Sequence, residues 1–212
     1  VGYAAGWTLV IVYEDLTREA RNITVFDGFS VVNRDNNPTI NISGFKTVPT
    51  GPVKAKIGFA ALEGELGIKG DQLTMKRRDG VYEALTAPGR PSNNFFNSTI
   101  TDENGINYNR KPKSRNTLGF DIGIFKLENT NNRILGNDTT EATFYFATRG
   151  DYYIPYMLAF SIEVIEPNIL MSKRVFNAAN QDVTGKNTIA LGETLRYEIK
   201  FQNQGNDNAK NL

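Results

Sequence analysis

The sequence predicts an all-β protein: a jelly-roll-like or β-sandwich domain, followed by the first strands of a second, Ig-like β-sandwich. Apolar and polar residues alternate with period two in many short segments, as in half-buried strands. Asparagine-rich clusters separate these segments, and asparagine favours turns because its amide bonds nearby backbone and tolerates positive φ. No segment keeps helical i, i+3, i+4, i+7 spacing over three turns, so strands account for the apolar pattern.

Ten strands are predicted in chain order. They cover residues 7–13, 22–26, 29–32, 53–61, 72–77, 118–124, 142–148, 153–165, 169–175 and 194–203. The first of them, "TLVIVYE", is apolar on both faces and is therefore expected to be a central strand covered on both sides. Trp7, the only tryptophan, leads this strand and is expected in the core.

The clearest two-faced strand is "VKAKIGFAA". Its predicted inner face carries only apolar side chains: Val53, Ala55, Ile57, Phe59 and Ala61. Lys54 and Lys56 lie on the opposite face, which is expected to be solvated. The last strand, "LRYEIKFQ", alternates in the same strict way.

Composition excludes several classes of function. The net charge is +1, with 24 basic and 23 acidic residues, so no basic field attracts nucleic acid. The chain has no histidine and no cysteine, which excludes Ser-His-Asp triads, cysteine nucleophiles, disulfides and the usual zinc sites. No run of 18 apolar residues occurs, so no membrane insertion is predicted.

A domain boundary is predicted at Pro167, which interrupts a long apolar run. The predicted domains are residues 1–165, a large β-domain, and 166–212, the beginning of another. Strand patterns start within a few residues of Val1 and stop soon after Asn203. We therefore expect the first domain to lack N-terminal strands and the second to be incomplete.

Two groups of motifs carry a family resemblance. "EPNILMSKRVFN" and "IALGETLRYEIKFQNQGNDNAKN" resemble the opening of a conserved Ig-like repeat found in tandem in very large bacterial surface proteins. The matching positions are Pro167, Lys173, Val175, Gly192, Glu193, Tyr197, Asn203, Gly205, Ala209 and Asn211. Upstream, "AGWTLVIVYED", "RNITVFDGF" and "FATRGDYYIPYMLAFSIEV" resemble the larger domain that often precedes such repeats.

This resemblance implies an adhesin or stalk on the bacterial cell surface. It implies a non-enzymatic module that supports attachment or spaces a binding tip from the cell, with neighbouring domains of the same long chain as partners. An incomplete repeat also leaves strand edges unpaired, so a second copy or another partner is expected to pair with it.

A calcium-assisted, lectin-like carbohydrate-binding domain is the alternative function. Calcium prefers carboxylate and amide oxygens, and the candidate ligands are Glu63, Asp71, Asp27 and Asp121. Sugar rings stack on aromatic faces, and the candidate platform is Tyr152, Tyr153 and Tyr156. The competing interpretation is that these are turn, capping and packing residues.

An enzyme is the third hypothesis. Glu63 and Glu65 would lie on one face of a strand, roughly 7 Å apart along it, near the separation of glycosidase carboxylates. The competing interpretation of "EGELGIKGD" is a solvated turn between strands. No catalytic residue and no cofactor other than calcium is predicted.

Overall fold

The computed structural model describes residues 4–15, 17–165, 167, 169–186, 188–205 and 208–209. The chain divides into two compact units, Val1–Val164 and Ile165–Leu212. The prediction of an all-β protein is confirmed, since the described residues form strands and one short 3-10 turn, η1 (Thr130–Asn132). No described helix is long and apolar enough to cross a membrane.

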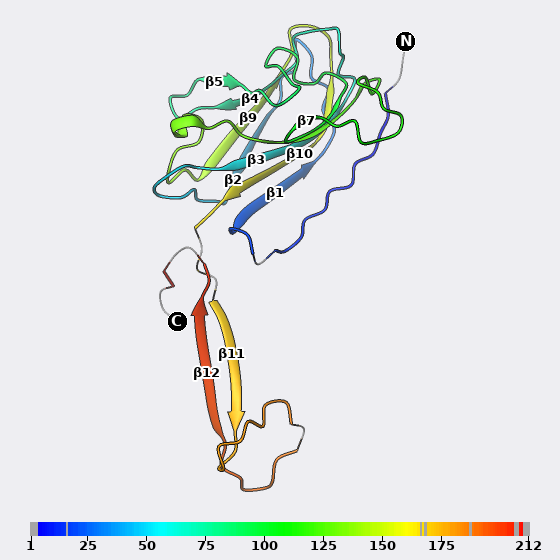
Figure 1. Cartoon of the computed structure of the whole chain (residues 1–212). Coiled ribbons are helices and arrows are strands. Elements are labelled where there is room, and N and C mark those ends of the chain that lie inside the picture. Colours follow the sequence, from blue (N-terminus) through cyan, green and yellow to red (C-terminus); the bar gives the residue numbers. More distant parts are fainter. Residues whose placement is uncertain are drawn as a thin grey trace. The chain divides into compact units, whose positions relative to one another are not determined.

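A six-stranded sheet forms one layer of the first unit (Figure 1). Its strands, in spatial order, are β1 (Arg21–Asp27), β10 (Ile154–Glu163), β3 (Ala55–Leu62), β8 (Phe120–Lys126), β6 (Ile100–Asp102) and β7 (Gly105–Ile106). Neighbouring strands are antiparallel except β6 and β8, which are parallel. The strand β1 is therefore one edge of this sheet.

A four-stranded sheet forms the second layer. It contains, in order, β2 (Thr39–Ser43), β9 (Glu141–Ala147), β4 (Gln72–Lys76) and β5 (Tyr82–Ala84). Aromatic rings meet between the sheets: Phe144 of β9 lies with its centroid 5.5 Å from that of Phe160 of β10. Face-to-face packing of this kind makes the first unit a two-sheet β-sandwich.

The strand β3 forms the centre of the core. The five side chains of the inner face predicted for "VKAKIGFAA" are all buried, which confirms that face. Each buried Ile or Phe contributes roughly 1.5–3 kcal/mol relative to an exposed one. On the opposite face, Lys54 is exposed and half-buried Lys56 pairs with Glu103 at 2.6 Å, whereas Gly58 and Ala60 are buried. The solvated face that the sequence predicts is therefore confirmed only for the first part of the strand.

The prediction of a strand at residues 7–13 is wrong. Residues 7–13 form no ladder with any described strand, and Trp7 is 83% exposed rather than buried. Two side-chain contacts hold this part of the chain: the Ala4 amide donates to Glu63 Oε1 (2.8 Å), and Thr8 Oγ1 bonds the Tyr156 hydroxyl (2.7 Å). A central strand needs a hydrogen-bonded neighbour on each side, and the described residues supply none.

Residues 29–32 also form no strand, although one was predicted; a single bridge joins Val32 to Tyr153. The strands β2, β5, β6 and β7 were not predicted. They have two to five residues each, which is too short for an alternation to stand out against turn residues.

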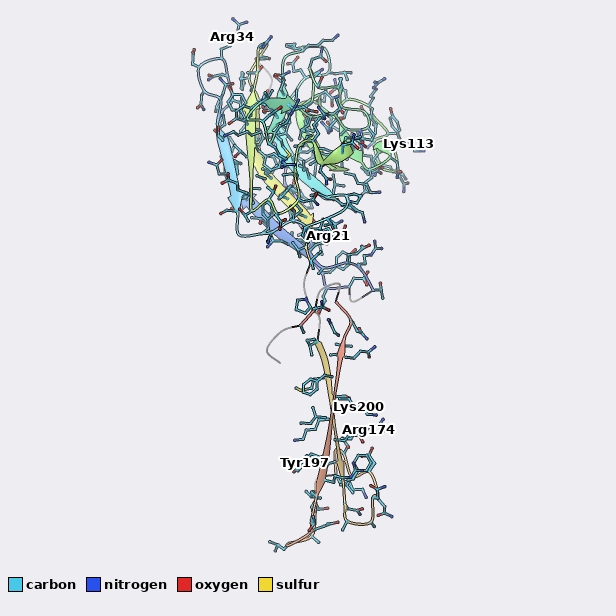
Figure 2. All side chains as sticks on the ribbon, turned by 90° about the vertical axis from the view of Figure 1, so that its left-hand side faces the viewer. Arg21, Arg34, Lys113, Arg174, Tyr197 and Lys200 are labelled. Carbon is cyan, nitrogen blue, oxygen red and sulfur yellow. The ribbon has the colours of Figure 1, made fainter. Side chains whose placement is uncertain are left out.

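The second unit contains a two-stranded ribbon of β11 (Ile169–Phe176) and β12 (Arg196–Asn203), close to the two strands predicted there. One face carries the directly paired Met171 and Phe201, which are 68% and 59% exposed. The other face is largely polar, with Arg174 opposite Glu198. Side chains such as Arg174, Tyr197 and Lys200 project from the ribbon (Figure 2). Asn211, part of the family motif, lies outside the described residues.

Candidate functional site

The four predicted calcium ligands differ in burial and in their place in the fold. Asp27 is exposed at the end of β1, Glu63 follows β3 with a φ of 64°, and Asp71 and Asp121 are buried. In the part of the chain that the structure describes, no three acidic residues gather as a metal-binding group. The four residues therefore form no common cage, and calcium binding stays a prediction.

Asp121 is half of a buried ion pair. Its Oδ1 accepts from Nη1 of Arg90 at 2.7 Å, and both side chains are fully buried. The backbone amides of Asn97, Ser98 and Thr99 also donate to the Asp121 carboxylate. Its oxygens are occupied by these donors, so Asp121 acts as a structural anchor in this conformation.

Arg90 ties the loop between the two sheets to the core. Its guanidinium donates to the backbone carbonyls of Phe95 (2.7 Å) and Thr99 (2.6 Å), and its Nε donates to Thr101 Oγ1 (2.8 Å). It also lies 4.6 Å from the centroid of the Phe59 ring. Burial lowers the pKa of Arg90, and the charge of Asp121 opposes that shift.

Asp71 is a second buried carboxylate, and no described cation forms a salt bridge with it. Its Oδ1 accepts from Thr148 Oγ1 at 2.6 Å. Burial raises the pKa of Asp71 to about 6, against a partial offset from the Thr148 hydrogen bond, and the acidic neighbours Asp151, Asp121 and Glu65 raise it further. This group changes charge in mildly acidic solution.

The three predicted sugar-stacking tyrosines do not form one platform. Tyr153 is fully buried; its ring stacks on Phe96 with centroids 4.3 Å apart, and its hydroxyl donates to the Gln72 carbonyl. The packing interpretation is thus correct for Tyr153, because a ring in the core cannot stack on a sugar. Tyr152 is 42% exposed, and Tyr156 lines an apolar hollow of about 140 Å³.

Glu63 and Glu65 do not lie on a strand, contrary to the geometry that the enzyme hypothesis requires. The strand β3 ends at Leu62, and Glu63 turns the chain with its left-handed backbone. The side chain of Glu63 accepts from Ala4, and its carboxylate raises the pKa of exposed Tyr152. "EGELGIKGD" is therefore a turn region, as the competing interpretation stated.

A polar hollow of about 470 Å³ lies between two loops of the sandwich. One loop is the turn from β4 to β5, which contributes Arg78 and Asp79, and the other contains η1. The lining residues are all polar or charged: Arg78, Asp79, Thr130, Asn131, Asn132 and Arg133. None of them was predicted as a site, because the two loops are more than 50 residues apart in the sequence.

No protein-family model matches this chain, and comparisons with curated proteins and with solved structures give no match either.

Proposed function

We propose that the chain is a non-enzymatic, extracellular module of a large bacterial surface protein, which supports attachment or spaces a binding tip from the cell. The motif resemblance of residues 167–211 to surface repeats supports this proposal. The exposed apolar face of the ribbon carries the structural part of the argument.

A two-stranded antiparallel sheet is marginally stable in water by itself. The β11–β12 ribbon has such a sheet, and Met171, Tyr197, Ile199 and Phe201 all present more than half of their surface to solvent. Exposed apolar groups of this size mark surfaces that contact other polypeptide. Neighbouring domains of the same long protein, or a second copy, would cover this face.

The first unit suits a passive structural role. The fully buried side chains of Arg90 and Asp121 form a salt bridge and also bond the backbone of the loop that they hold. Networks of this kind fix one conformation of a core. A rigid β-sandwich can then present its loops at a constant position.

Surface display tests the attachment role. A non-adherent bacterium displaying the chain should be retained in flow on a host-cell monolayer more than the same cells displaying an unrelated β-sandwich. Equal retention of the two would refute the attachment role. Turnover of a polysaccharide by the purified chain would refute the non-enzymatic assignment.

A further inference from the structure

We propose that the polar hollow binds an acidic saccharide, meaning a sugar ring that carries a carboxylate or sulfate group. The hollow has a volume of about 470 Å³, is open to solvent and is lined only by polar and charged residues. An open polar surface of this kind suits a hydrophilic ligand better than an apolar one. This binding function goes beyond the structural role proposed above.

One positively charged side chain of the hollow, that of Arg78, has no acidic partner among the described residues. Asp79 pairs with Arg77 at 2.5 Å, and Glu83 bonds Arg133 and lies 3.7 Å from Arg77. Among the described residues, Arg78 has no acidic partner and no hydrogen-bond acceptor. A guanidinium presents a planar fork of donors that matches a carboxylate or a sulfate.

The exposed side chain of Arg78 lies across Gly136, in the segment that follows η1. Its stem and guanidinium cross Gly136 so closely that a Cβ on this glycine would lie 2.6 Å from Arg78 Cδ. The missing side chain at Gly136 therefore makes room for the arginine. An anion in the hollow could pair with the Arg78 guanidinium without first displacing an acidic partner.

The rest of the lining fits hydroxyl groups better than apolar groups. Thr130 and Asn131 are exposed and offer both donors and acceptors, while Asp79 offers carboxylate oxygens. A sugar ring presents hydroxyls that both donate and accept, so it can bond all three kinds of group. These residues favour a ligand with hydroxyl groups over a simple anion.

Both walls of the hollow are fixed before any ligand arrives. On the η1 side, Asn129 donates to the Val53 and Leu135 carbonyls, and Asn132 donates to Gly51. On the hairpin side, Asp79 Oδ1 accepts from the Val81 amide at 3.1 Å. Fixed loops lower the entropic cost of binding because little has to be ordered.

Titration followed by NMR of backbone amides and arginine Nε–H groups tests the proposal. Glucuronate is the probe, with glucose as the uncharged ring and acetate as the anion without a ring. We expect glucuronate to shift the signals of Arg78, Asn131 and Arg133 and to bind at least about tenfold more tightly than either control. Arg78→Gln should weaken binding by about tenfold.

Two further variants distinguish binding at this site from a general effect of positive charge and from a loss of folding. Lys113→Gln removes one positive charge from another loop of the first unit (Figure 2) and should leave binding unchanged. Asn131→Gly removes a lining amide, and glycine tolerates the positive φ of 55° found there, so this variant should fold and bind less tightly.

Several outcomes would overturn the proposal. These are the absence of shifts at the hollow, equal affinity for glucuronate and glucose or acetate, and tighter binding of N-acetylaspartate amide, a model of an acidic peptide. Loss of glucuronate binding with normal retention of displaying cells refutes this site alone. Loss of retention with normal glucuronate binding refutes the attachment role alone.

Discussion

Arg90 and Asp121 form a salt bridge of 2.7 Å between side chains that are both inaccessible to solvent. The pair lies where β8 meets the loop leading to β6, and each partner also bonds backbone groups. Taking two charges out of water costs several kcal/mol for each ion, so the geometry must be close to ideal for the fold to tolerate the pair. The folding of this loop therefore depends on both residues.

Asp121→Asn should lower the free energy of unfolding by about 3–5 kcal/mol, because it leaves the Arg90 charge unpaired in the core. Urea denaturation measures this change. The double variant Arg90→Met, Asp121→Asn should stay destabilised, since carbonyls and amides of the loop would remain unsatisfied.

The exposed pair of Lys46 and Asp138 is the matched control. Asp138→Asn should cost less than about 1 kcal/mol, as is usual for surface salt bridges. A cost for Asp121→Asn as small as this, or a double variant as stable as the original, would contradict the structural role of the buried pair.

Asp71 should make the stability of the first unit depend on pH. Its pKa is 3.8 when unperturbed and about 6 in the fold, so between these values the unfolded chain is ionised while the folded chain keeps its proton. The contribution of Asp71 to the free energy of unfolding should therefore fall by about 2–3 kcal/mol as pH rises through that window.

Asp71→Asn should remove this dependence on pH. The free energy of unfolding of the variant, compared with that of the original chain, should therefore be higher at pH 8 than at pH 4. Urea denaturation at both pH values measures the difference, with exposed Asp35→Asn as control. Identical pH profiles of the Asp71→Asn variant and the original chain would contradict the assignment.

Trp7 reports on the segment that does not join a sheet. It is the only tryptophan and is 83% exposed, so its fluorescence should have the emission maximum of indole in water and should be quenched readily by iodide. Emission at shorter wavelength together with protection from iodide would place Trp7 in a core instead.

The apolar face of the ribbon should drive association in concentrated solution. Sedimentation velocity over a range of protein concentrations should show larger species, because Phe201 and its neighbours would then be covered. Phe201→Lys should reduce this association, while Lys200→Gln, on the opposite face, should leave it unchanged. Association that is insensitive to Phe201→Lys would exclude this face as the contact.

The sequence predicts the long strands well because their side chains alternate against one large core. The strands β3, β9 and β10 follow this rule, and their inner residues Phe59, Phe144 and Phe160 are buried. Residues 7–13 show why the rule fails elsewhere: an apolar β-prone segment becomes a strand only when another strand bonds it. That condition depends on tertiary structure, which local pattern does not contain.

The residues of the buried ion pair and of the hollow could likewise not be paired from local sequence pattern. In "FDIGIF", Asp121 shares a face with Gly123 and Phe125, so a carboxylate pointing into the core could have signalled a buried partner. Nothing local identifies that partner as Arg90, which lies 31 residues earlier in a turn. Arg78 and η1 likewise come together only through the fold.

Hydrogen exchange of the dilute chain, measured segment by segment, tests most directly whether the ribbon needs a covering partner. We predict that amides of β11 and β12 exchange rapidly at low concentration while amides of β3 and β10 stay protected, since only the latter lie in a packed sandwich. Ribbon amides as strongly protected as those of β3 at the highest dilution would show a self-sufficient second unit and contradict the proposed modular role.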